Sequence, residues 1–162
     1  MFDTFTSTAG KIFTRELLVS RAEEWRAHGL KIVMTNGCFD LLHAGHITSL
    51  ENARALGNAL IVAINSDASV RRLKGPGRPI NKQEDRARVL AALACVDAVT
   101  IFDEDTASVL LHLLRPHVYA KGGDYNVHNL PERGTVESFG GRIVITPLLP
   151  GHSTTDLIAT LK

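Results

Sequence analysis

The stretch Ile32-Val-Met-Thr-Asn-Gly-Cys-Phe-Asp-Leu-Leu-His-Ala-Gly-His46 combines a short apolar run, a turn and the start of a helical segment. The run Ile32–Thr35 is typical of a strand buried on both faces, and Asn36-Gly37 predicts a tight turn after it. His43 and His46 are three residues apart and therefore share one face of a helical first turn. Because a helix N-terminus favours anions, two imidazoles placed there predict a phosphate site.

Four further apolar runs follow this stretch, and segments with helical spacing separate them. The runs, which predict strands, are 60–65, 99–102, 118–120 and 143–146. The predicted helices are 17–25 before Gly29, 46–56, 82–93 after the N-cap Asn81, 107–114, 131–139 and a last one opening at Ser153. This alternation predicts an α/β fold, a doubly wound (Rossmann-like) five-stranded parallel sheet with helices on both faces.

Length and composition predict one ordinary globular domain. The chain has 162 residues, of which 44% are hydrophobic, so we expect a single domain over 1–162 with a poorly ordered N-terminal extension at 1–13. The net charge of +1 excludes a globally basic nucleic-acid-coating protein. The two cysteines, Cys38 and Cys95, suit a reducing compartment rather than a disulfide framework. With no secretory signal and no long apolar span, we expect a cytoplasmic protein and no membrane partner.

Chemistry-bearing residues also follow the other predicted strands, at the edge where open α/β sheets bind ligands. The basic segment 65–80 is interpreted as a mobile arm that carries Lys74 and Arg78 to phosphates. Arg86, in the next helix, is placed to point back at the same site. The histidine pair could instead bind a metal. A third ligand at a suitable spacing is missing, although Asp40 could be recruited.

The last two strands are followed by glycines and hydroxyl side chains. Lys121-Gly122-Gly123-Asp124-Tyr125 follows one strand, where the glycines allow close backbone approach and Asp124 can accept a bond from a ribose or sugar hydroxyl. Ser153-Thr154-Thr155 follows the other strand, at a predicted helix start. These three residues are either ordinary helix caps or a seat for phosphates.

Thr35–His46 resembles the His-x-Gly-His signature of the nucleotidylyltransferase superfamily, which binds the triphosphate of a nucleotide. Class I aminoacyl-tRNA synthetases share this motif, but the chain is short for one and has no Lys-Met-Ser-Lys-Ser loop. From about Lys31 to Leu161 it resembles the bacterial D-glycero-β-D-manno-heptose 1-phosphate adenylyltransferases. That likeness also rests on the 65–80 segment, Asp-Glu-Asp-Thr at 103–106, Lys-Gly-Gly-Asp-Tyr at 121–125 and Ser-Thr-Thr at 153–155.

The resemblance implies an enzyme that transfers the adenylyl group of ATP to heptose 1-phosphate, giving ADP-heptose and pyrophosphate. It implies the HxGH nucleotidylyltransferase fold, Mg²⁺ held mainly by the phosphates and a homodimer. The net charge of +1 and the aromatic content of 6% predict no nucleic-acid partner. Many relatives carry a fused sugar kinase, so a separate heptose 7-phosphate kinase is the expected pathway partner. Thr135 stands where an acidic residue is expected. A phosphomonoester has a second pKa of about 6, so the acceptor phosphate needs no general base.

The residues divide into three expected roles. The catalytic residues, which stabilise the phosphates being cleaved, are His43, His46 and Lys74. The nucleotide-binding residues are Asn36, Gly37, Cys38, Phe39, Gly45, Lys121, Gly122, Asp124, Ser153, Thr154 and Thr155. Asp40, Arg78 and Arg86 are expected to bind the sugar phosphate, with Asp40 on a sugar hydroxyl.

Two other functions stay open at the level of sequence. One is a cytidylyltransferase for a polyol or alcohol phosphate such as glycerol 3-phosphate, since backbone groups can choose the base. The other is a non-catalytic nucleotide-binding regulator, although such a protein would be expected to lose Lys74 or one of the histidines. The sequence does not decide the base, the sugar anomer, the destination of the product (lipopolysaccharide, another glycan or signalling) or the role of His128.

Overall fold

The computed structural model describes residues 7–123 and 125–147, which form a five-stranded parallel sheet in the order β3-β2-β1-β4-β5. The strands are β1 (Ile32–Gly37), β2 (Ala59–Asn65), β3 (Ala98–Phe102), β4 (Val118–Gly122) and β5 (Arg142–Thr146). Each matches a predicted strand to within two residues. The predicted doubly wound fold is therefore confirmed.

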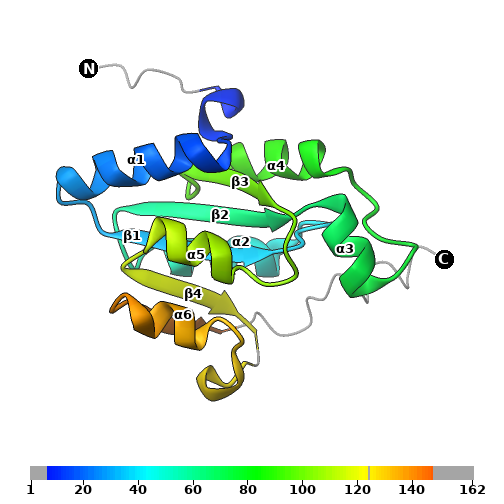
Figure 1. Cartoon of the computed structure of the whole chain (residues 1–162). Helices are drawn as coiled ribbons and strands as arrows, with labels where there is room; N and C mark the ends of the chain where they lie inside the picture. The colour runs from blue at the N-terminus through cyan, green and yellow to red at the C-terminus, as the bar shows by residue number, and fades with distance from the viewer. Residues whose placement is uncertain (1–6, 124, 148–162) are drawn as a thin grey trace.

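Helices cover both faces of this sheet. They are η1 (Thr8–Lys11), α1 (Arg15–Ala27), α2 (Ala44–Arg54), α3 (Asp67–Lys74), α4 (Gln83–Ala91), α5 (Ser108–Leu114), η2 (Val127–Asn129) and α6 (Arg133–Ser138). In Figure 1, α1 and α5 lie in front of the strands and α2 lies behind them. None of the helices formed by the described residues is both long and apolar enough to cross a membrane.

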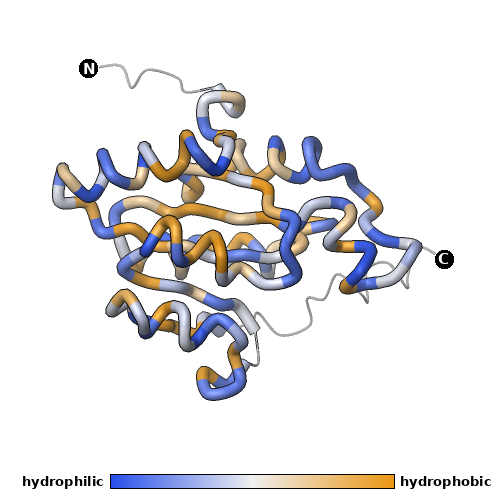
Figure 2. Tube along the Cα trace, in the orientation of Figure 1, coloured by the Kyte–Doolittle hydropathy of each residue, from blue (hydrophilic) through white to orange (hydrophobic). Residues whose placement is uncertain are grey.

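Two apolar cores lie on the opposite faces of the sheet. The first joins α1, α5 and α6 to the strands through residues such as Leu18, Leu111 and Val136. The second joins α2 and α4 through residues such as Leu50 and Leu90. All seven residues of β2 are buried, and Figure 2 shows the strands as the apolar centre of the molecule. Burial on both faces explains why the strands are continuous apolar runs.

The order of the strands places a crevice at the end of β1. The chain runs outward from β1 through β2 to β3 and then returns to β4, on the other side of β1. The connections from β1 and β4 therefore leave in opposite directions and open a gap at their carboxyl ends. Figure 1 shows α3 beyond these ends, so side chains from several elements can meet there.

The segment 65–80 is not an open arm, and this part of the prediction is wrong. Residues 67–74 form helix α3, because Ser66 accepts a hydrogen bond from the backbone N–H of Ser69 at the N-cap and Val70 is buried. Lys74 is the last residue of this helix, and Gly75 ends it with a φ of 96°. The predicted cap Asn81 is also displaced by one residue, since Lys82 is the N-cap of α4.

Residues 7–13, expected to belong to a poorly ordered extension, pack against the edge of the sheet. Ile12 forms a parallel bridge with Val99 of β3, and the N–H of Phe13 donates to the carbonyl of Val99 at 2.9 Å. The ammonium of Lys11 donates to the carbonyls of Leu93 and Val96. These residues therefore belong to the folded domain, and residues 1–6 lie outside the described part of the chain.

Candidate active site

A pocket of about 500 Å³ lies at the carboxyl ends of β1, β2 and β4. Its walls come from the β1–α2 connection, the end of α3 with the segment after it, Asp105 and Thr106 of the β3–α5 connection, and the residues around β4 and before α6. The sequence-predicted residues Asn36–Asp40, His46, Lys74, Arg78, Lys121 and Gly122 all line it. The topology therefore brings together groups that are up to 86 positions apart, from Asn36 to Gly122.

The histidine pair sits at the start of α2. His43 is the N-cap residue, and its backbone N–H donates to Nδ1 of His46 at 3.3 Å. The two rings lie 3.9 Å apart between centroids, and the ring of Phe39 lies 5.5 Å from that of His46. Because Nδ1 of His46 accepts a hydrogen bond, the neutral ring carries its proton on Nε2. His46 lines the pocket, whereas His43 supports it from the N-cap.

Burial, followed by the nearby His43, lowers the pKa of His46 to about 4. The imidazole is therefore neutral near pH 7 and keeps its Nε2–H as a donor. A neutral donor at a helix N-terminus can bind a phosphate oxygen without a change in its own charge.

Phe39 adopts a left-handed backbone with φ of 47°, a rare conformation for an aromatic residue. Its ring folds back over Gly37, where an added Cβ would meet the ring at 3.0 Å. A side chain at position 37 would therefore press against this ring, which glycine avoids. The ring in turn packs beside His46 and fixes one wall of the pocket.

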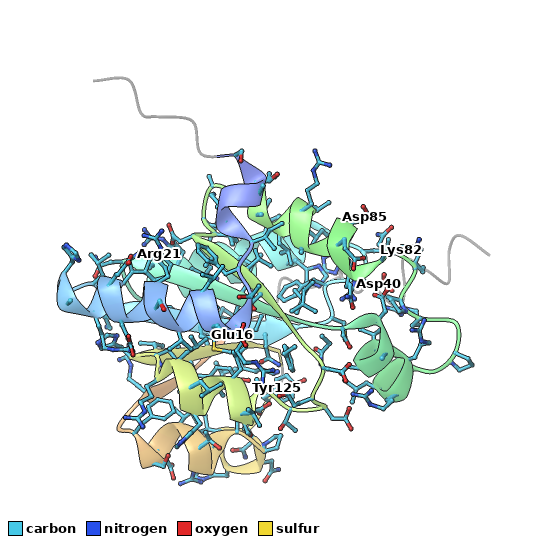
Figure 3. All side chains as sticks on the ribbon, turned by 45° about the horizontal axis from the view of Figure 1, so that its top comes forward. Glu16, Arg21, Asp40, Lys82, Asp85 and Tyr125 are labelled. Atoms are coloured by element: carbon cyan, nitrogen blue, oxygen red, sulfur yellow. The ribbon has the colours of Figure 1, made fainter. Side chains whose placement is uncertain are left out.

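Asp40 and Arg78 form an ion pair at the pocket. Nε of Arg78 donates to Asp40 at 2.6 Å, and the backbone N–H groups of Ile80 and Asn81 also donate to the Asp40 carboxylate. Burial alone would raise the pKa of Asp40, but these hydrogen bonds outweigh it and lower that pKa. Asp40 is therefore an internal anchor, not a carboxylate available for a sugar hydroxyl as expected. Figure 3 shows it close to Lys82, at the start of α4.

Arg86 does not line the pocket, so its expected contact with the sugar phosphate is corrected. Its side chain is fully buried and donates to the carbonyls of Asn81 and Cys38 and to the carboxylate of Asp67. These three bonds tie together the β1–α2 connection, α3 and the segment before α4. The guanidinium holds the walls of the pocket in place, because its fork of donors is committed to them.

The cations that do face the pocket are Lys74, Arg78 and Lys121. Lys74 is exposed at the end of α3. Arg78 uses Nε for Asp40, and its terminal nitrogens make no hydrogen bond with any described residue. The side chain of Lys121 donates to Oδ1 of Asn36 at 3.0 Å and lies 5.3 Å from the centre of the Tyr125 ring. Burial lowers the pKa of Lys121, and the charge of Glu132 partly offsets this.

Several residues in or beside the pocket wall carried no recognised signal in the sequence. Tyr119 donates its hydroxyl to Oδ1 of Asn36 at 2.5 Å, beside the bond from Lys121. Ser49 and Thr146 share a hydrogen bond of 3.0 Å, next to Gly122. A Cβ at Gly122 would lie 2.6 Å from Oγ of Ser49, so this strand end is shaped for close approach. Only the fold, which brings strands of distant sequence together, reveals these contacts.

A family model described as cytidylyltransferase-like matches residues 34–159. The chain belongs to the cytidylyltransferase-like family. This result confirms the predicted resemblance to the nucleotidylyltransferase superfamily and fits the histidine pair at the end of β1.

The curated relatives of this cytidylyltransferase-like chain are longer proteins. It is 51% identical over 148 residues to the bifunctional protein HldE of Pelobacter propionicus, a match that covers 91% of this chain and 30% of that protein. It is 58% identical over 134 residues to the bifunctional protein HldE of Streptomyces coelicolor, covering 83% of this chain and 29% of that protein. The chain thus spans about 30% of the length of these relatives.

Solved structures of other proteins share the cytidylyltransferase-like fold. The lipopolysaccharide core biosynthesis protein of Thermoplasma volcanium superposes with a TM-score of 0.62 at 25% identity, over 75% of this chain and 98% of that one. The pantoate-beta-alanine ligase of Francisella tularensis superposes with a TM-score of 0.58 at 15% identity, over 92% of this chain and 76% of that one. The second likeness concerns the fold alone.

The described part of this cytidylyltransferase-like domain contains no group of three His, Cys, Asp or Glu side chains that could hold a metal ion. Asp40 is already saturated by Arg78 and two backbone donors. The alternative metal site of His43, His46 and Asp40 therefore finds no support.

The remaining predicted residues of the cytidylyltransferase-like domain lie elsewhere. Asp124, Ser153, Thr154 and Thr155 fall outside the described residues, as does the helix expected from Ser153. Gly45 is buried in the first turn of α2. His128 is exposed and shares a hydrogen bond of 2.6 Å with Arg133, and Thr135 faces the groove between α5 and α6. Neither of these two lines the pocket.

Proposed function

We propose that this chain transfers the adenylyl group of ATP to D-glycero-β-D-manno-heptose 1-phosphate, releasing pyrophosphate. The observation that carries the proposal is the meeting of neutral His46 with the cations Lys74, Arg78 and Lys121 in one pocket at the end of β1. Identity of about half over most of the chain to proteins named HldE adds support. The sugar phosphate itself comes from the sequence resemblance.

The reaction joins two polyanions, so the main demand on the protein is charge stabilisation and positioning. An oxygen of the sugar 1-phosphate attacks the α-phosphorus of ATP, and the bond from that phosphorus to the bridging oxygen of the β-phosphate breaks. The electron pair leaves with pyrophosphate. The acceptor phosphate is mostly dianionic near neutral pH, because its second pKa is about 6, and no protein base is required.

Each pocket residue has a proposed task in this reaction. His46 donates Nε2–H to a phosphate oxygen of ATP, with His43 supporting the helix start. Lys74 stabilises the charge that develops during transfer. Arg78, fixed by Asp40, holds the acceptor phosphate with its terminal nitrogens. The strand-end backbone around Asn36–Phe39 and the Lys121–Asp124 region seat the nucleoside. By resemblance, Ser153–Thr155 hold the β and γ phosphates.

Magnesium is proposed to arrive as the Mg–ATP complex, its usual form in such reactions, held mainly by phosphate oxygens. A homodimer, a heptose 7-phosphate kinase as the pathway partner and a cytoplasmic location also belong to this proposal. Two observations bear on the kinase partner and on the location. The matched relatives are named bifunctional and are longer than this chain, and Cys38 and Cys95 are both free thiols.

A second candidate is a cytidylyltransferase for a polyol or alcohol phosphate, which the family description favours. The deciding experiment measures pyrophosphate release with ATP, CTP, GTP and UTP, each crossed with heptose 1-phosphate, mannose 1-phosphate and glycerol 3-phosphate. We expect release with ATP and heptose 1-phosphate. Release mainly with CTP and glycerol 3-phosphate would replace the proposal, and no release with any pair would favour the regulatory alternative.

A further inference from the structure

Glu132 carries an unusual oxygen atom. The residue is 3% exposed and lines the pocket. Its Oε1 accepts a hydrogen bond from the backbone N–H of Ala107 at 3.3 Å, whereas the buried Oε2 has no hydrogen-bond partner among the described residues. A buried carboxylate oxygen without a partner is costly and is seldom retained. This carboxylate lines the pocket, its charge acts on Lys121, and its Oε2 receives no hydrogen bond from any described residue.

The position of this carboxylate is fixed by two helices. Glu132 is the N-cap residue of α6, and Ala107, which donates to it, is the N-cap residue of α5. Its neighbours in the pocket wall are Thr106, Leu130 and Pro131. Both helices pack on the face of the sheet opposite α2. The carboxylate thus belongs to the wall across the crevice from His46.

The chemistry of Oε2 differs from that of the rest of the pocket. His46, Lys74, Arg78 and Lys121 offer hydrogen-bond donors, which suit phosphates. An ionised carboxylate only accepts hydrogen bonds, and it repels a phosphate. A ligand group that satisfies Oε2 must donate a proton into a hydrogen bond while the anionic part of the ligand stays near the cations. A phosphorylated polyol has this division of groups, with hydroxyl donors at one end.

We propose that Glu132 Oε2 accepts a hydrogen bond from a hydroxyl of the acceptor sugar and thereby selects polyhydroxylated acceptors. The inference rests on the proposed function and adds a specificity-determining residue to it. Lys121 lines the same pocket: its ammonium donates to Oδ1 of Asn36 at 3.0 Å, and the charge of Glu132 acts on it. The same nearby cation disfavours a metal ion at Oε2, since two positive charges would repel each other.

The test compares the wild type with Glu132→Gln and Glu132→Ala. The glutamine keeps the shape and can still accept from Ala107, but it presents an amide donor or an uncharged oxygen to the pocket. The matched control is Glu137→Gln, which changes an exposed carboxylate of α6 that pairs with Arg133. Thermal unfolding of each variant confirms that it is folded before kinetics are measured.

We expect Glu132→Gln to raise the KM for heptose 1-phosphate by about 10- to 100-fold, as loss of a hydrogen bond to a charged group does. The KM for ATP and the Mg²⁺ requirement should stay within about twofold of wild type, as should all values for Glu137→Gln. Calorimetry gives a readout without turnover: wild type should bind ADP-heptose more tightly than ADP, and Glu132→Gln should lose this preference.

The outcomes separate the inference from the proposed function. If the wild type releases no pyrophosphate from ATP and heptose 1-phosphate, the proposed function fails. If the wild type is active and Glu132→Gln leaves the acceptor KM unchanged, the inference is wrong. A selective rise in the KM for ATP would assign Oε2 to the nucleobase, and a selective rise in the Mg²⁺ requirement would assign it to the metal. Either result also overturns the inference.

Discussion

The guanidinium of Arg78 donates to the carboxylate of Asp40 at 2.6 Å, joining two residues 38 positions apart. Asp40 has no exposed side-chain surface, and Arg78 keeps 18% of its own. The same carboxylate accepts from the backbone of Ile80 and Asn81. One buried charge therefore anchors the whole segment between α3 and α4 and fixes an arginine at the rim of the pocket.

Removal of this charge should loosen the segment. Asp40→Asn keeps the shape but loses the ion pair, so we expect a loss of roughly 3 kcal/mol in the free energy of unfolding, measured in urea. The KM for the acceptor should rise as Arg78 loses its fixed position. Glu24→Gln, which removes an exposed pair with Arg21, is the control and should change stability by less than about 1 kcal/mol. Equal effects of the two variants would contradict the anchoring role.

Arg86 should behave as a structural residue. Arg86→Ala leaves Asp67 and two carbonyl groups without their donor, and we expect about 3–5 kcal/mol of destabilisation. Arg86→Lys should recover only part of this, because one ammonium cannot reproduce the three bonds of the guanidinium fork. Urea unfolding measures both effects. A raised acceptor KM with unchanged stability would instead restore the sequence-based role in substrate binding.

His46 and Lys74 should affect turnover more than binding. Either His46→Ala or Lys74→Ala should lower kcat by about 10²–10³, the usual effect of losing a preorganised donor to the transition state. Steady-state kinetics with ATP and the acceptor measures this change. His28→Ala, which alters an exposed residue at the end of α1, is the matched control. Near-normal kcat in either pocket variant would exclude the assigned role.

The low pKa of His46 makes stability depend on pH. The pKa of the His46 ring is about 4 in the folded chain, whereas its ordinary value is 6.5. Between about pH 6.5 and pH 4, His46 is therefore protonated in the unfolded chain but neutral in the folded chain. The stability of the wild type therefore falls as the pH is lowered from about 6.5 to about 4. His46→Gln should lack this component. The measurement is the urea-unfolding free energy of both proteins at about pH 7.5 and pH 4.5; parallel losses in the two would refute the assignment.

Gly122 allows the end of β4 to approach Ser49. Gly122→Ala places a Cβ 2.6 Å from Oγ of Ser49, and we expect roughly 1–3 kcal/mol of destabilisation from overpacking. In Gly122→Ala/Ser49→Ala the clashing oxygen is gone, so the double variant should be more stable than Gly122→Ala alone. Ser49→Ala alone, which loses the bond to Thr146, should cost about 1 kcal/mol. Additive losses would show that the contact is unimportant.

The sequence predicted the sheet well because each strand is a continuous apolar run, and such runs occur where both faces are covered. It also placed His46, Lys74, Arg78 and Lys121 correctly at one edge, since parallel strands bring their carboxyl ends together. Helix α3 was missed because its charged residues outnumber its single buried apolar one, Val70. The sequence did contain an N-cap residue, Ser66, which accepts from the N–H of Ser69, but this single residue was not enough to predict the helix.

The roles of Asp40 and Arg86 could not be read from residue type. The residue type of an Asp or Arg near a phosphate site is the same whether its side chain faces the ligand or the protein. The difference depends on backbone groups, such as the N–H of Ile80 and the carbonyl of Cys38, whose direction is set only by the folded chain. Glu132 was missed for a related reason. Only the folded structure shows that none of the described groups donates a hydrogen bond to its Oε2.

The bridge between Ile12 and Val99 has a practical meaning for anyone who shortens or fuses this domain. β3 is an outer strand, and the backbone of Ile12 and Phe13 occupies part of its open side. A version that starts at residue 14 would uncover hydrogen-bonding groups that attract the strands of other molecules. Such a version should precipitate more readily even with its pocket intact, so a tag or a junction belongs ahead of Ser7.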